Sequence, residues 1–177
     1  MDLRVVKTKK CISESFYKLR KKHPLESITI KELCETALIN KATFYLHYKD
    51  IYDLANHLEE ELIQTTLSDL VHLEYLFEDP AEFHKEFQHA MQAHADQLQI
   101  LFSGDRLPIL SLRIESVLKS YLFEKYPERK DDIKLNLLLT YFIHGSHCAY
   151  FNNQLYERAE ALEIINEMTD SLLKKFL

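Results

Sequence analysis

The sequence predicts an all-α protein, with an N-terminal three-helix helix-turn-helix domain in residues 1–50 and a C-terminal helical bundle domain in residues 51–177. Three observations carry this prediction. The 177 residues include only 2 glycines and no Asn-Gly or Asp-Gly pair of the kind that closes a β-hairpin. Apolar residues make up 46% of the chain, which is enough for a packed core. They recur at the three- and four-residue spacing of helices, between residues that cap helix ends.

The first two helices are predicted from apolar spacing and capping. Residues 4–23 form the first helix, which ends before Pro24 and turns four apolar side chains inward: Val5, Ile12, Phe16 and Leu19. Thr29 and Glu32 have the spacing of a capping box, in which each side chain satisfies a backbone N–H of the first helical turn. The second helix that follows has one apolar face, made of Ile30, Leu33, Cys34 and Ala37.

A tight turn at Leu38 and Ile39 separates this helix from a third, at residues 41–48, for which Asn40 is the N-cap. Phe44 and Tyr48 stand four residues apart on it and are expected to enter the core together. The other sides of the helix then carry polar and basic residues. Asp50 caps a longer helix, which the leucine spacing extends over 51–77.

The remaining helices are delimited by turn residues. Asp79 and Pro80 begin a helix over 80–102, and Ser103-Gly104-Asp105 breaks the chain before the next, at 108–125. Two last helices, 128–151 and 156–176, are joined by a turn at 152–153 into an antiparallel hairpin. Its exposed apolar stripe is expected to pair with a second copy in a two-fold symmetric four-helix interface. The alternative is that the hairpin completes the core of one chain. The stripe consists of Leu138, Phe142, Cys148, Leu162, Ile165, Met168 and Leu172.

Charge is distributed unevenly along the chain. Residues 1–50 carry 11 lysines and arginines against 6 acidic residues, whereas residues 51–177 carry 11 against 22. The net charge is therefore +5 at the N-terminal end of a chain whose total is −6. Such an asymmetry suggests a surface for a polyanion at one end only. The alternative is that these cations form the solvated face of the first helix.

The run Ala42-Thr43-Phe44-Tyr45-Leu46-His47-Tyr48-Lys49-Asp50, preceded by the helix from Thr29 to Ala37 and followed by Leu54, resembles the TetR/AcrR family of bacterial transcriptional regulators. The similarity covers the first third of the chain. It implies a homodimer whose third helix enters the major groove of a palindromic operator. The family's members are most often repressors, and their divergent second domain dimerises and often binds a small effector.

Positions at helix starts and on the outward face then predict the DNA contacts. Seven residues are expected to contact the DNA backbone: Thr29, Lys31, Asn40, Thr43, Tyr45, His47 and Lys49. Three others could reach base edges: Lys41, Ala42 and Leu46. Two positions depart from the family pattern. Leu38 stands where a glycine is usual, so the turn is expected to use negative φ. Ile51 stands where many members have a phosphate-contacting lysine, a role that Lys49 could take over.

Histidines and tyrosines in the second domain suggest an effector cavity, because polar tips among apolar walls suit an organic ligand. The candidates are His94, Tyr121, Tyr141, His144 and His147, and their alternative role is simple packing. No metal or cofactor is expected, because the histidines lack the spacing of a metal motif. Motifs for phosphate binding or hydrolysis are missing too, so an α-helical enzyme is the least favoured reading. A regulator controlled by a protein partner is the second alternative.

The cellular location is predicted to be the cytoplasm. Residues 1–10 are polar and basic, unlike a signal peptide, and Cys11, Cys34 and Cys148 form no paired framework. The most apolar run, 135–151, contains Asn136, His144 and His147 and is shorter than the ~20 residues of a membrane span.

Overall fold

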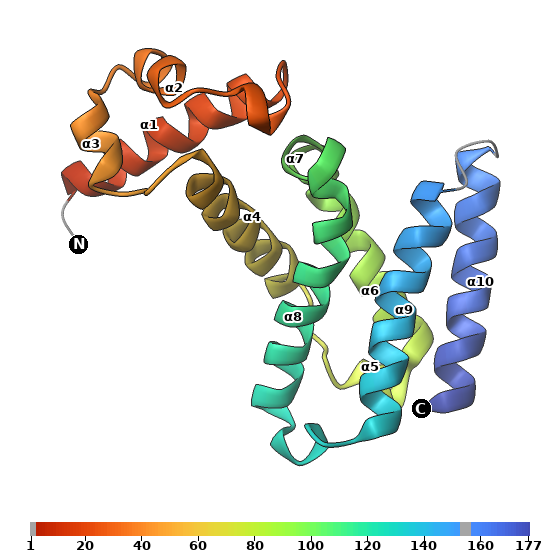
Figure 1. Ribbon diagram of the computed structural model, residues 1–177. Coiled ribbons are helices and arrows are strands. Elements are labelled where there is room, and N and C mark those ends of the chain that lie inside the picture. The colour runs from red at the N-terminus through yellow and green to blue at the C-terminus, as the bar shows by residue number, and fades with distance from the viewer. Residues whose placement is uncertain (1–2, 153–156) are drawn as a thin grey trace. The chain divides into compact units, whose positions relative to one another are not determined.

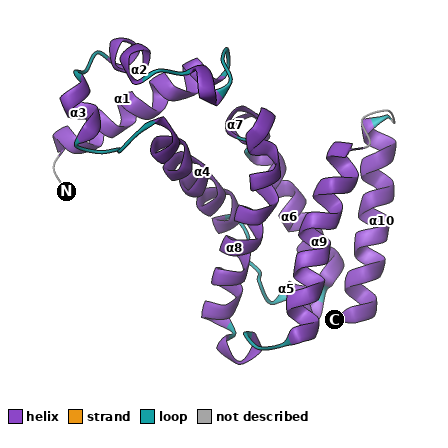
Figure 2. Cartoon of the chain, in the orientation of Figure 1, coloured by secondary structure: helices purple, strands orange, loops and turns teal. Residues whose placement is uncertain are grey.

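The computed structural model describes residues 3–152 and 157–177, and all regular structure in these ranges is helical (Figures 1 and 2), which confirms the all-α prediction. The predicted turn at 152–153 and the predicted helix start at Tyr156 lie partly outside the described residues. The α-helices are α1 (Leu3–Arg20), α2 (Ile30–Ala37), α3 (Lys41–Tyr45), α4 (Ile51–Ser68), α5 (Tyr75–Glu78), α6 (Pro80–Ala93), α7 (Ala95–Leu101), α8 (Leu107–Lys125), α9 (Ile133–Asn152) and α10 (Arg158–Phe176). Short 3-10 turns lie at Leu25–Ser27, Gly104–Arg106 and Pro127–Arg129.

The chain packs into two compact units. The first contains Met1–Leu62 and also Ala95–Leu107, and the second contains Ile63–His94 and Pro108–Leu177. The first unit therefore takes in α7, a segment distant in sequence, because Leu98, Leu101 and Phe102 are buried in it together with the α1 side chains Ile12 and Phe16. The second unit is a bundle of α5, α6, α8, α9 and α10 around a core of leucines and phenylalanines, among them Leu76, Phe83, Leu118, Leu139 and Leu173.

Four predicted N-caps are present. The side chains of Thr29, Asn40, Asp50 and Asp79 each accept a hydrogen bond from the backbone N–H three residues later. Such a bond satisfies one of the donors that the first turn of a helix leaves unpaired. The helix starts at α2, α3, α4 and α6 therefore follow from local chemistry.

Several helix limits differ from the prediction. The first helix ends at Arg20 rather than at His23. The helix starting at Ile51 ends at Ser68 rather than Phe77, because Leu70 and Leu73 are buried in an irregular segment that turns toward α5. The predicted helix over 80–102 is broken between α6 and α7 at His94, whose φ of −111° and ψ of 12° leave the helical region. The helix predicted from residue 128 begins at Ile133, where Asp132 accepts a hydrogen bond from the N–H of Leu135 at 3.1 Å.

Several inward and outward assignments also need correction. Val5 was expected in the core but is 38% exposed, as its position in the first turns of α1 leaves nothing to cover it. Leu138 and Phe142 were expected in the exposed stripe but are buried in the second unit. The exposed apolar residues of α9 lie instead on another face, at Ile133, Leu137 and Tyr141.

None of the helices in the two described ranges combines the length and apolar character needed to span a membrane.

Candidate functional site

The turn between α2 and α3 is built around a left-handed residue. Leu38 has φ 54° and ψ 41°, so the expectation of negative φ was wrong. Two hydrogen bonds hold this conformation: the N–H of Leu38 donates to Glu35 O at 3.4 Å, and the N–H of Ile39 donates to Cys34 O at 3.0 Å. This pair of bonds is the Schellman arrangement, in which glycine is the usual left-handed residue. The left-handed turn is therefore formed here without a glycine.

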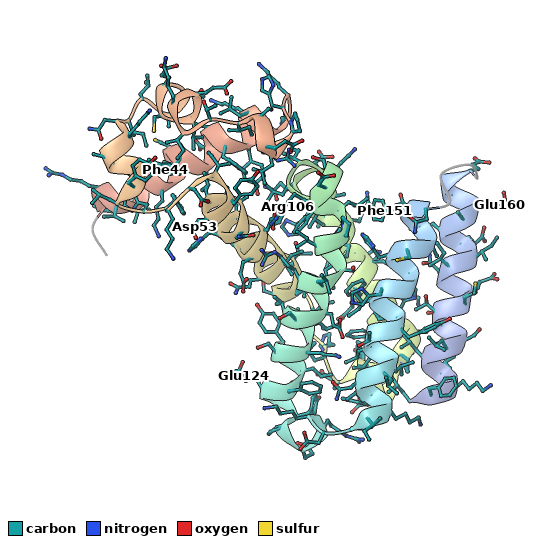
Figure 3. The ribbon with its side chains drawn as sticks, viewed as in Figure 1. Phe44, Asp53, Arg106, Glu124, Phe151 and Glu160 are labelled. Atoms are coloured by element: carbon teal, nitrogen blue, oxygen red, sulfur yellow. The ribbon has the colours of Figure 1, made fainter. Side chains whose placement is uncertain are left out.

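Two aromatic side chains, one from α3 and one from the turn that follows it, pack α3 into the core of the first unit. Phe44 is fully buried (labelled in Figure 3), and Tyr48 is 6% exposed, with the two ring centroids 5.8 Å apart. The ring of Tyr48 also meets His57 of α4 edge-on at 5.5 Å. Burial raises the pKa of Tyr48, first of all, and the nearby carboxylates Glu61 and Asp53 raise it further. The predicted core role of Phe44 and Tyr48 is thus confirmed.

The helix α3 is shorter than the predicted 41–48. It ends at Tyr45, and residues 46–48 continue as a turn, in which His47 and Tyr48 both donate backbone hydrogen bonds to Phe44 O. The next cap begins directly afterwards. The N–H of Lys49 donates to the Asp53 carboxylate at 2.9 Å while Asp50 caps the N–H of Asp53 at 2.8 Å. The backbone of Lys49 is therefore held at the start of α4.

The predicted DNA contacts lie on the surface of the first unit. Thr43 and His47 are half-buried, and the other eight are exposed: Thr29, Lys31, Asn40, Lys41, Ala42, Tyr45, Leu46 and Lys49. Asn40 Oδ1 accepts from both the N–H and the hydroxyl of Thr43, so these two polar groups are held together at the start of α3. Leu46 is 80% exposed, so its apolar side chain is accessible to a partner. These residues form what we call the α3 face.

The cysteine on α2 lies away from this face. Burial is the main cause that raises the pKa of the Cys34 thiol. The charge of Lys41 lowers this pKa in part, and Glu35 raises it further. A buried thiol with a raised pKa is an inert small apolar group rather than a nucleophile.

The predicted effector residues all belong to the second unit but do not form one lining. His94 Nε2 lies 3.3 Å from the Asp69 carboxylate, and the Tyr121 hydroxyl donates to Gln64 O at 3.3 Å. Tyr141 is 66% exposed, so it is not part of an enclosed cavity. Burial lowers the pKa of His147, and the charge of nearby His144 lowers it further.

A polar cluster around Glu115 includes His144 and was not predicted from the sequence. Glu115 accepts hydrogen bonds from Lys119 Nζ at 2.6 Å, from His144 Nε2 at 2.8 Å and from the hydroxyl of Thr140. Burial raises the pKa of Glu115, but these three hydrogen bonds outweigh it and bring the pKa from 4.5 to about 2. Each helix shows a four-residue spacing, Glu115 to Lys119 and Thr140 to His144, which is the signal that sequence alone offered.

His147 has the one orphan polar atom found among the described side chains: its Nε2 is buried without a hydrogen-bond partner. Its ring packs on Phe151, with centroids 4.7 Å apart. In the same ranges no three histidine, cysteine or carboxylate side chains come close enough together to hold a metal ion.

Comparisons with known proteins add no relative: neither the protein-family models nor the curated proteins gave a match to this chain.

Proposed function

We propose that the chain is a sequence-specific DNA-binding transcription regulator that acts as a homodimer, with the α3 face against DNA. One observation carries the proposal. The left-handed turn at Leu38 and the buried ring of Phe44 present α3 so that Lys41, Tyr45 and Lys49 are exposed within residues 1–50, whose net charge is +5. A helix presented in this way, after a shorter helix and a tight turn, is the arrangement that reads the major groove.

The chemistry of the α3 face fits such a contact. Lysine and tyrosine side chains supply charge and hydrogen-bond donors for phosphates, while the exposed apolar groups Ala42 and Leu46 suit thymine methyl groups. The net charge of +5 in residues 1–50 attracts the polyanion, and the acidic remainder of the chain disfavours coating of DNA. Binding should therefore weaken steeply with salt, because phosphate contacts release counterions.

The DNA contact can be tested without knowing the operator. Selection from random double-stranded DNA would give a bound sequence, and fluorescence anisotropy would then measure affinity for it and for single-base changes. Tyr45→Ala and Lys49→Ala should weaken binding to all sequences, whereas Lys41→Ala should relax the preference at one base pair. Lys174→Ala, an exposed lysine on α10, is the matched control. Wild-type affinity in all three α3 variants would remove this face from the groove.

Dimerisation is proposed to use exposed apolar residues of the hairpin α9–α10, whose helices lie side by side in Figure 1. Ile133, Leu137 and Tyr141 line one face of α9 at four-residue spacing, and Ile164 and Met168 are exposed on α10. Apolar groups concentrated on one surface in this way mark an interface. Two-fold symmetry would then require a palindromic operator, with half-sites about 34–36 Å apart if they lie one helical turn from each other.

The dimer has its own test. Met168→Glu places a charge in the proposed interface, so the sedimentation coefficient at micromolar concentration should fall to the monomer value. Glu124→Lys, an exposed position on α8 that Figure 3 labels, should leave it unchanged. A monomeric wild-type protein under these conditions contradicts the interface.

We further propose that a small effector controls DNA binding, and that it binds near His144 and His147, the predicted residues that lie beside the Glu115 cluster. The buried, unpartnered Nε2 of His147 supports this choice. An effector that lowers DNA affinity 100-fold must prefer the non-binding state by about 2.7 kcal/mol. Ligands that raise the melting temperature but leave DNA affinity unchanged would instead favour a regulator controlled by a protein partner.

A further inference from the structure

The first unit contains a cavity of about 500 Å³, lined by residues outside the α3 face. It lies where three segments meet: the end of α1 with residues 20–26, the first turn of α4 at Tyr52, and the turn at residues 103–106. All three belong to the first unit. The volume is within the range of sites for small organic molecules.

A buried cation forms one wall of this cavity. Arg20 is 5% exposed, and its guanidinium donates to the backbone oxygens of His23 at 3.0 Å and Leu101 at 3.2 Å, and to Ser103 Oγ at 2.8 Å. These acceptors are all neutral, and among the described residues no carboxylate lies within 4 Å of the guanidinium. A buried positive charge whose direct hydrogen-bond acceptors are all neutral is costly, because neutral dipoles offset the charge only in part.

The pKa of Arg20 reflects the same imbalance. Burial lowers it, Glu26 and Glu59 raise it in part, and the charge of Arg106 lowers it again. Glu59 does not serve Arg20 as a partner, because its carboxylate is held in a two-pronged ion pair by Arg106 Nε and Nη2. The region around Arg20 is therefore short of negative charge.

The residues at the mouth of the cavity, which we call its rim, add further cations. Lys21 and Lys22 are exposed, and no carboxylate in the described ranges pairs with either of them. Glu26 and Asp105 are the two carboxylates of the lining, so cations outnumber them. Tyr52 presents a ring that is 52% exposed. The cavity thus combines an excess of positive charge, two carboxylates that can accept hydrogen bonds from hydroxyl groups, and one aromatic surface.

We propose that this cavity binds a small phosphorylated metabolite, with its phosphate at Lys21 and Lys22 near the buried Arg20 and its hydroxyl-bearing part between Tyr52 and the rim carboxylates. Lysines bind phosphate as point charges, and a multiply charged anion offsets more than one cation. The carboxylates Glu26 and Asp105 can accept hydrogen bonds from sugar hydroxyls. A DNA strand cannot enter so small a cavity, so the inference does not depend on the proposed DNA contact.

Binding has a structural consequence within the first unit. The Arg20 hydrogen bonds tie α1 to residues 101–103, and the Arg106 ion pair (Arg106 is labelled in Figure 3) ties the next turn to α4. A ligand in the cavity contacts all three segments at once. It therefore stabilises the folded first unit by an amount that rises with the logarithm of its concentration relative to its dissociation constant.

The test uses the full chain with ribose 5-phosphate and inorganic phosphate as probes, and sodium chloride at matched ionic strength as the control. Ribose 5-phosphate should raise the melting temperature saturably and slow hydrogen exchange in residues 20–26 and 101–106, with phosphate alone acting more weakly. The double variant Lys21→Gln/Lys22→Gln should raise the dissociation constant for ribose 5-phosphate at least about tenfold. Each substitution removes one charged hydrogen bond to the phosphate. The matched double variant Lys7→Gln/Lys9→Gln, on exposed positions of α1 that do not line the cavity, should not raise this constant.

Tyr52→Ala separates the two parts of the ligand, because it should weaken ribose 5-phosphate and leave inorganic phosphate unchanged. Three outcomes overturn the proposal. Neither probe raises the melting temperature saturably, the two double lysine variants lose affinity for ribose 5-phosphate equally, or sodium chloride alone raises the melting temperature as much. If Lys21→Gln/Lys22→Gln weakens DNA binding while neither probe binds, these lysines contact the DNA backbone instead, and the metabolite site is refuted.

Discussion

Replacing Leu38 by glycine should stabilise the protein, although it removes an apolar side chain. Leu38 is 92% exposed, so the substitution removes almost no buried area. For a residue with a Cβ, the left-handed region is unfavourable by roughly 1–2 kcal/mol, whereas glycine adopts it without this strain. Glycine in turn makes the unfolded chain more flexible, at a cost of roughly 0.4–1 kcal/mol. The difference between these two costs gives Leu38→Gly a net gain between about 0 and 1.6 kcal/mol, with a midpoint of ~0.8 kcal/mol.

Leu38→Ala is the matched control, because alanine keeps the Cβ and the strain but loses the same exposed side chain. It should leave the free energy of unfolding within about 0.5 kcal/mol of wild type. Urea unfolding followed by far-UV circular dichroism suits this chain, which contains no tryptophan. With a urea dependence of roughly 1–3 kcal/mol per molar, a difference of ~1 kcal/mol between the two variants moves the midpoint by about 0.3–1 M.

Hydrogen exchange gives a second readout confined to the turn. The amides of Leu38 and Ile39 donate the two bonds that close it, so they should become more protected in Leu38→Gly than in Leu38→Ala. Equal stability of the two variants, or a less stable glycine variant, refutes the reasoning: the left-handed conformation would then carry no strain.

The remaining predictions concern buried groups. Phe44→Ala should destabilise by about 3–5 kcal/mol because the ring is fully buried, whereas the exposed neighbour Tyr45→Ala should cost less than about 1 kcal/mol in thermal unfolding. Arg106→Ala leaves the Glu59 carboxylate, 1% exposed, without its ion pair and should cost about 3–5 kcal/mol; adding Glu59→Gln should restore part of this loss in a double-mutant cycle. The pKa of Glu115 is lowered from 4.5 to about 2, so the stability it contributes is present above pH 4.5 and is lost as pH falls toward about 2. Glu115→Gln should flatten the acid side of the stability curve, and an unchanged curve would show that the Lys119, Thr140 and His144 bonds do not form in solution.

Features that depend on neighbouring residues in the chain were readable from the sequence. The caps at Thr29, Asn40, Asp50 and Asp79 need only a side chain and an amide three residues later, and all four are present. The inward pair Phe44 and Tyr48 follows from spacing on one short helix with one apolar side. These local signals predict α2, the turn after it and the start of α3, and therefore most of the α3 face.

Features that depend on packing between distant segments were not readable. The helix α4 ends at Ser68 without a glycine or proline, because burial of Leu70 and Leu73 outweighs helix propensity. On α9 the apolar residues run nearly all round, so spacing could not tell that Leu138 and Phe142 face the core while Leu137 and Tyr141 face outward. The cavity beside Arg20 requires contacts to Leu101 and Ser103, more than 80 positions away in sequence.

The path of the chain limits how an effector could act on DNA binding. The two units are joined at three points, Leu62–Ile63, His94–Ala95 and Leu107–Pro108, rather than by one linker. The first lies inside α4 and the third at the start of α8, where helical hydrogen bonds resist bending, while the second coincides with the break at His94. In the regulator proposed above, a displacement of α6 or α8 would therefore be carried into residues 95–107. The contacts of Arg20 and Arg106 would pass it to α1 and α4, and Tyr48 packs its ring on His57 of α4. A phosphorylated ligand beside Arg20 would strengthen these same contacts. It would then couple to DNA affinity through the positions of α1 and α4, with no contact to the α3 face.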